Sequence, residues 1–165
     1  MPDIEKFYNK LKKDTEDGGY NLNPDKEFVL DLIQGLLTNE ERYGYQSCPC
    51  RLAEGTKEKD LDIICPCDYR DPDLAEHGAC YCALYVTQEW IDGKVPQKSI
   101  PERRVKEDHE DRIPASPAVS SDFGLHFPVW RCRVCGYLCA RESPPEVCPI
   151  CKANKDRFEI FIESG

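Results

Sequence analysis

Long hydrophobic runs are missing from this 165-residue sequence, and no stretch approaches the ~18 apolar residues of a membrane-spanning helix. The N-terminus, MPDIEKFYNK, has no apolar signal run, so we expect a cytoplasmic protein without membrane contact. A glycine-rich nucleotide loop is also absent, which argues against direct use of NAD(P)H or a flavin. Positive charge is scarce: 22 basic and 31 acidic residues leave a net charge of −9, so we expect no nucleic-acid partner.

Cysteine is what the sequence has in excess, with eleven residues. In a secreted chain, so many cysteines would indicate a disulfide scaffold. Here the number is odd, and the cysteines lie within short spacings typical of metal sites. This pattern favours a reducing compartment, with thiols committed to iron and one regulated disulfide.

Six of the cysteines form three Cys-x-Cys motifs, separated by 14 and 12 residues. Six thiols are two more than one four-ligand metal centre requires. We therefore expect a cluster to take four thiols and leave two as a redox dithiol, although spacing alone does not say which. The first, second and third motifs are Cys48-Pro49-Cys50, Cys65-Pro66-Cys67 and Cys80-Tyr81-Cys82.

The segments CPCR, CPCDYR, CYCALYVT and IPERR, within Phe7 to Arg104, resemble the catalytic subunit of ferredoxin:thioredoxin reductase. The resemblance implies an all-helical domain that binds a [4Fe-4S] cluster and reduces a thioredoxin- or glutaredoxin-like protein. Ferredoxin or another low-potential carrier would be the electron donor. It also implies which cysteines bind the cluster and which form the redox-active disulfide: Cys48, Cys65, Cys67 and Cys80 for the cluster, and Cys50 with Cys82 for the disulfide.

The resemblance also implies a mechanism. The first electron would break the disulfide, leaving Cys82 on the cluster side and Cys50 as the nucleophile that attacks the partner's disulfide. Arg51 either favours the Cys50 thiolate or is a solvated surface residue. The resembled subunits have histidine where this sequence has Tyr81, and a tyrosine does not titrate near neutrality. His77 either takes over that role or simply lies near a helix end.

The C-terminal segment carries two Cys-x-x-Cys knuckles, separated by 12 residues. From about Pro128 it resembles a rubredoxin in the short-loop form found at the end of rubrerythrins, with Trp130, Tyr137 and Phe158 as core aromatics. The resemblance implies one mononuclear iron, while zinc remains open because four thiolates also suit zinc. The extra thiol Cys139 is not assigned to the metal. The expected ligands are Cys132, Cys135, Cys148 and Cys151.

Helical periodicity and capping signals predict a mostly helical N-terminal half. One helix is expected to begin at Asn23-Pro24, with an apolar stripe that packs in the core. Glycine at position 78 should end another helix that begins near Asp71-Pro72. The predicted helices cover residues 3–14, 24–39, 57–64 and 72–77.

These patterns divide the chain into three parts. Residues 1–104 form the helical reductase-like domain, and 128–165 form a small rubredoxin-like β domain. The segment between them, 105–127, is rich in charge, proline and serine and reads as a linker.

The favoured function is an oxidoreductase that acts on a disulfide and receives single electrons through the rubredoxin iron and the [4Fe-4S] cluster. A pure electron-transfer protein is the main alternative, and a zinc-stabilised interaction protein is a third. The presence of both centres in one chain indicates that they exchange electrons, and it leaves the direction of electron flow open.

Overall fold

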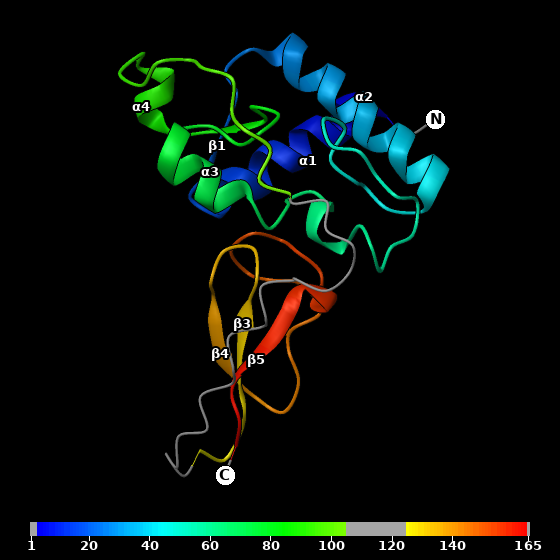
Figure 1. Ribbon diagram of the computed structural model, residues 1–165, viewed down its shortest axis with the longest axis vertical. Coiled ribbons are helices and arrows are strands. Elements are labelled where there is room, and N and C mark those ends of the chain that lie inside the picture. The colour runs from blue at the N-terminus through cyan, green and yellow to red at the C-terminus, as the bar shows by residue number, and fades with distance from the viewer. Residues whose placement is uncertain (1–2, 105–124, 165) are drawn as a thin grey trace. The chain divides into compact units, whose positions relative to one another are not determined.

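A computed structural model describes residues 3–104 and 125–164, arranged as two compact units, Met1–Pro101 and Glu102–Gly165 (Figure 1). The first unit is mainly helical and the second contains a small β-sheet, which confirms the predicted fold class. Most of the predicted linker, residues 105–124, lies outside the described residues.

Two long helices open the first unit, α1 (Ile4–Asp17) and α2 (Lys26–Tyr43). Each begins with an aspartate whose carboxylate accepts a hydrogen bond from a first-turn backbone N–H. The cap of α2 is Asp25, so the predicted start at Asn23-Pro24 is two residues early.

One face of α2 forms the centre of the core, which confirms the prediction made from its apolar stripe. Phe28 is the exception, because 38% of its surface is exposed. The apolar residues of α1 pack against this face and close it on one side. The buried residues of α2 are Val29, Leu32, Ile33, Leu36 and Leu37.

The predicted helix over residues 57–64 is wrong, since only the 3₁₀ turn η1 (Leu61–Ile63) forms there. The buried side chain of Asp60 organises this loop instead. Its carboxylate accepts hydrogen bonds from the Tyr45 hydroxyl at 2.6 Å and from the backbone N–H groups of Glu54 and Gly55, both at 2.9 Å. These buried hydrogen bonds stabilise the loop conformation. A short exposed helix would gain less, because its first turn is costly to nucleate.

The rest of the first unit is short. Helix α3 (Arg70–His77) ends at Gly78, as predicted, with φ of 74°. The strands β1 (Asn21–Leu22) and β2 (Tyr85–Val86) form one antiparallel pair, and α4 (Gln88–Ile91) follows. Within the described residues, no helix combines the length and apolar character needed to cross a membrane.

The second unit is a three-stranded antiparallel sheet in the order β4-β3-β5. Its strands are β3 (Val129–Cys132), β4 (Leu138–Ala140) and β5 (Phe158–Ile162), and the 3₁₀ turn η2 (Lys155–Arg157) precedes β5. Trp130, Tyr137 and Phe158 belong to its core, as predicted.

We predict that Asp60→Asn destabilises the first unit by about 3 kcal/mol, because an amide cannot accept from all three donors and leaves buried groups unsatisfied. Denaturant unfolding of the full chain, followed by the far-UV α-helical signal, measures this, since the α-helices of the described residues all lie in the first unit. Asp31→Asn, on the exposed face of α2, is the matched control and should change little. Equal stability of the two variants would contradict the prediction.

Candidate metal centres

The first and second Cys-x-Cys motifs are held together by antiparallel backbone pairing. The Cys48 N–H donates to the carbonyl of Ile63 at 2.8 Å, and the Cys65 N–H donates to the carbonyl of Gln46 at 2.8 Å. The first motif also packs on α2, where Gly35 faces Pro49 so closely that a Cβ at Gly35 would lie 2.7 Å from the Pro49 Cβ. A glycine at this point of the helix therefore lets the first motif lie against α2.

The third motif occupies a tight turn before β2. The Cys80 N–H donates to the carbonyl of Tyr85 at 2.9 Å, and the Ala83 N–H donates to the carbonyl of Cys80 at 2.7 Å. The Asn23 side chain fixes this turn from outside by donating to the carbonyl of Ala83 at 3.0 Å. Backbone hydrogen bonds thus determine where the sulfurs of all three motifs lie.

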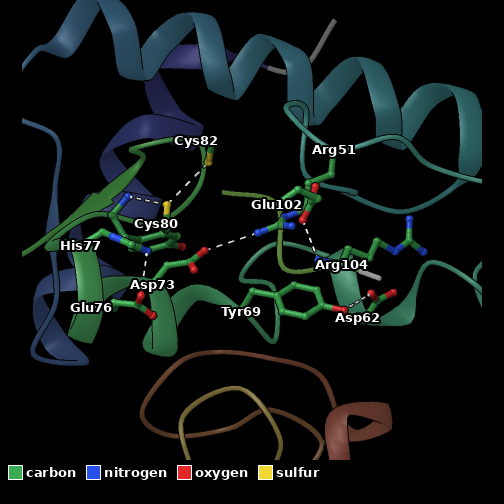
Figure 2. A network of polar contacts seen from close by, with 11 residues as sticks. Arg51, Asp62, Tyr69, Asp73, Glu76, His77, Cys80, Cys82, Glu102 and Arg104 are labelled. Atoms are coloured by element: carbon green, nitrogen blue, oxygen red, sulfur yellow. Dashed lines mark hydrogen bonds and ion pairs between the residues drawn. The ribbon is translucent and has the colours of Figure 1, made fainter. Parts of the chain in front are cut away.

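Interactions between the thiols link the first and third motifs. Sulfurs Cys80 Sγ and Cys82 Sγ lie 3.6 Å apart and face each other in Figure 2. The thiols of the first motif also lie near Cys82, whose pKa they raise. The six thiols differ in access to solvent, because Cys50 is exposed whereas the others are buried or half-buried.

The environment shifts the pKa values of these thiols in opposite directions. Hydrogen bonds with the Cys48 and Cys82 thiols lower the pKa of Cys50 to about 3, and the charge of Arg51 acts in the same direction. Burial raises the pKa of Cys67 to about 12 and raises that of Cys65 well above its usual range. The pKa of Cys80 is lowered too, so Cys50 is the exposed one of two readily ionised thiols.

Arg51 is buried, so the solvated surface arginine considered above is wrong. Its side chain is inaccessible to solvent and pairs with the buried Asp73, with Nη2 and Oδ2 separated by 3.4 Å (Figure 2). The guanidinium lies over the rings of Tyr69 and Tyr81, 4.7 and 4.4 Å from their centroids. Tyr81 thus contacts the arginine that follows the exposed thiol.

His77 lies at the end of α3, with Nε2 3.7 Å from the Glu76 carboxylate.

Sequence reasoning missed a second buried arginine, Arg70, which lies over Tyr20 and Tyr85 and pairs with Asp71 at 2.8 Å. A signal was present, because Arg51 and Arg70 each stand three residues after a cysteine, in CPCR and CDYR.

These residues fit an iron–sulfur cluster. Arg70 Nη2 and Ser47 Oγ are buried and have no hydrogen-bond partner among the described residues. Such donors are costly unless an acceptor is present, and an anionic cluster with sulfur ligands provides acceptors. The division of the thiols into Cys48, Cys65, Cys67 and Cys80 as ligands and Cys50 with Cys82 as a disulfide stays a prediction.

The second unit brings its four predicted ligands together, with all four sulfurs within 4.8 Å of one another. The two knuckles have the same backbone design. The N–H of Gly136 donates to the carbonyl of Cys132 at 2.9 Å, and the N–H of Lys152 donates to the carbonyl of Cys148 at 3.1 Å. Both donors have positive φ, 77° for glycine and 62° for lysine. Such paired knuckles let four thiolates surround one ion tetrahedrally.

The extra thiol, Cys139, lies on β4 opposite Trp130 and is half-buried. Burial raises its pKa, so it remains a neutral thiol. It does not belong to the four-sulfur group.

A helical unit with three linked Cys-x-Cys motifs and a β unit with a four-thiolate knuckle site define a cysteine-ligated metal protein. Residues 2–108 match the family model described as ferredoxin thioredoxin reductase catalytic beta chain, and the chain belongs to that family. This family consists of [4Fe-4S] disulfide reductases that use ferredoxin to reduce thioredoxins, as the resemblance of the motifs implied.

The second unit has relatives of its own. Residues 130–159 match the rubredoxin-like domain of rubrerythrin. Over 36 residues the chain is 52% identical to reverse rubrerythrin-1 of Clostridium acetobutylicum. That match covers 22% of this chain and 20% of the relative, so the chain spans about a fifth of that protein's length.

We predict that Gly35→Ala displaces the first motif and destabilises the unit by about 1–3 kcal/mol, because the added Cβ would overlap Pro49. In an ordinary exposed helix, the same change would stabilise by up to ~1 kcal/mol. Denaturant unfolding and iron content measure the effect, with Gln34→Ala as the exposed neighbouring control. Adding Pro49→Gly to the Gly35→Ala variant should restore the lost free energy of unfolding. A Gly35→Ala variant as stable as the wild type would refute the close contact.

We also predict that Cys135→Ser removes the metal ion of the second unit, because three remaining thiolates no longer complete the site. Cys139→Ser should retain the ion, since this thiol lies outside the site. Metal analysis of the full-length variants, with iron and zinc measured separately, compares the two. Loss of metal from the Cys139 variant would contradict the ligand set.

Proposed function

We propose that this chain is an iron–sulfur disulfide reductase that passes single electrons through a rubredoxin-type iron to a [4Fe-4S] centre and an adjacent Cys50–Cys82 disulfide. The acceptor is a thioredoxin- or glutaredoxin-like protein, and the donor is ferredoxin or another low-potential carrier. The observation that carries the proposal is that an exposed thiol, Cys50, and a buried thiol, Cys82, are near enough to shift each other's pKa.

Exposure divides the roles of the two thiols. A nucleophile must reach a disulfide on another protein, and Cys50 is the exposed cysteine of the three motifs. Cys82 is only 8% exposed and lies 3.6 Å from Cys80, a predicted cluster ligand. The buried thiol is therefore suited to internal exchange, next to the metal centre.

The thiol chemistry balances without another reactant. The Cys50 thiolate attacks one sulfur of the partner's disulfide, forming a mixed disulfide and releasing the partner's other thiolate. Cys82 then attacks the Cys50 sulfur, which releases the partner as a dithiol and forms the Cys50–Cys82 disulfide. Two electrons and two protons return this disulfide to the dithiol.

When bound, the cluster supplies these electrons one at a time, since iron–sulfur centres are one-electron carriers. The four-thiolate site of the second unit fits an iron that feeds it, and the rubredoxin-like match favours iron over zinc. Rubredoxins are generally weaker reductants than a thioredoxin-type dithiol, and each 30 mV uphill costs about 1.4 kcal/mol for this two-electron couple. The rubredoxin-type iron must therefore have a lowered potential, receive electrons from a strongly reducing donor, or be coupled to steady removal of the product.

The test replaces Cys50 by serine in the anaerobically purified full chain. We expect the iron content to persist, because Cys50 is not a predicted ligand, and thioredoxin disulfide reduction to fall to the uncatalysed rate. A reduced low-potential dye supplies electrons, and appearance of thioredoxin thiols is the assay. Cys139→Ser is the matched control and should keep both iron and activity.

Two results would count against the proposal. Undiminished activity of the Cys50 variant would show that another sulfur attacks the partner. An iron-loaded wild-type protein that reduces no disulfide would favour the alternative, an electron-transfer protein without reductase activity.

A further inference from the structure

The first and second Cys-x-Cys motifs each lead directly into a buried arginine. The Arg51 N–H donates to the carbonyl of Cys48 at 3.3 Å, and the Arg70 N–H donates to the carbonyl of Cys67 at 3.2 Å. Arg51 is 5% exposed and Arg70 is 1% exposed. Each arginine is therefore fixed by a turn that begins at a cysteine of its own motif.

Each guanidinium also contacts two tyrosine rings, one of them in or just after the third motif. Arg51 lies over Tyr69 and Tyr81, and Tyr81 is the central residue of the third motif. Arg70 lies 3.7 Å from the ring centroid of Tyr20 and 5.1 Å from that of Tyr85. We call these groups the Arg51 cluster and the Arg70 cluster.

The Arg70 cluster reaches the sulfurs through Tyr85. The Tyr85 N–H donates to Cys80 Sγ at 3.3 Å, and its ring lies over Arg70 from the second motif. The Arg51 cluster joins the first motif to Tyr81 in the third. Together the two clusters connect all three motifs through side chains, in addition to the backbone pairing.

The two positive charges lie near the cysteines in sequence and in space. Arg51 directly follows Cys50, and its guanidinium lies over the ring of Tyr81, the residue between Cys80 and Cys82.

Burying two guanidinium groups is unfavourable unless nearby negative charge compensates them. Arg70 pairs with Asp71, which remains partly exposed, with 30% of its side chain accessible. Arg70 Nη2 still lacks a hydrogen-bond partner among the described residues. Several thiolates in a buried centre would supply the remaining negative charge, and the same attraction makes it easier for such a centre to accept an electron.

We propose that the Arg51 and Arg70 clusters are positioning devices that hold the three Cys-x-Cys motifs in register and place two fixed positive charges beside the sulfurs, which raises the reduction potential of the centre. This inference rests on the proposed iron–sulfur function. Arg51 and Arg70 are positioning residues, because they act through the sulfurs and not on the partner's disulfide.

The test compares Arg70→Gln and Arg70→Lys in the full chain, with a redox titration of the cluster followed by its EPR signal. We expect Arg70→Gln to lower the equilibrium constant for one-electron reduction at least tenfold, a shift of about 59 mV to lower potential. Arg70→Lys keeps the charge and should restore most of this loss. Arg51→Gln and Arg51→Lys should follow the same pattern.

A surface pair provides the matched control. Lys26 lies 5.1 Å from the ring centroid of Tyr8 and pairs with Glu5 at 3.1 Å, which is the same chemistry at an exposed place. Lys26→Gln should leave the potential unchanged, because solvent and salt screen its charge. A shift of the same size as in Arg70→Gln would overturn the proposal.

Asp71→Asn gives a variant with the opposite expected sign. It removes the counter-charge of Arg70 and keeps the guanidinium, so the potential should rise. This variant keeps the proposal falsifiable if the glutamine variants fail to bind iron. Arginine and aspartate variants that move the potential in the same direction, or not at all, would overturn the inference. A wild-type protein without a cluster signal would overturn the proposed function as well.

Discussion

The first unit depends on the balance of buried charge around its six thiols. Arg51 and Arg70 carry permanent positive charge into a region where water is excluded, and desolvated charges of one sign are unstable without charges of the other. The aspartates beside them compensate in part, and sulfur ligands of an anionic cluster are suited to compensate the rest. The residues that link the motifs therefore also place positive charge where the proposed one-electron centre would lie.

The two units contain sulfur sites built in different ways. In the second unit, four thiols come from two knuckles of nearly identical backbone geometry, and they lie close enough to surround a single ion. In the first unit, the thiols come from three motifs that are linked by backbone pairing and by the contacts of the arginine clusters, and the first motif packs against Gly35. A single-ion site needs four converging sulfurs, whereas a cluster with a neighbouring disulfide needs six sulfurs with unequal access to solvent.

The elements that the sequence predicted well are governed by local interactions. The apolar stripe of α2 and the glycine that ends α3 act within one or two helical turns, and both are present in the structure. The predicted helix over residues 57–64 failed because Asp60 makes hydrogen bonds with Tyr45 and with the backbone of its own loop. Contacts of this kind depend on how distant segments pack, and periodicity within a short window does not contain them.

The sequence by itself determined the spacing of the cysteines, and through it the four-thiolate knuckle site, the three Cys-x-Cys motifs and the family to which the chain belongs. Ligand spacing is local, because residues two or three apart have few ways to direct their side chains. Only the tertiary structure decided that Arg51 and Arg70 are both buried, and that Cys50 is exposed whereas Cys82 is buried. Burial is a property of all the segments that pack around a residue, so no single segment of the sequence specifies it.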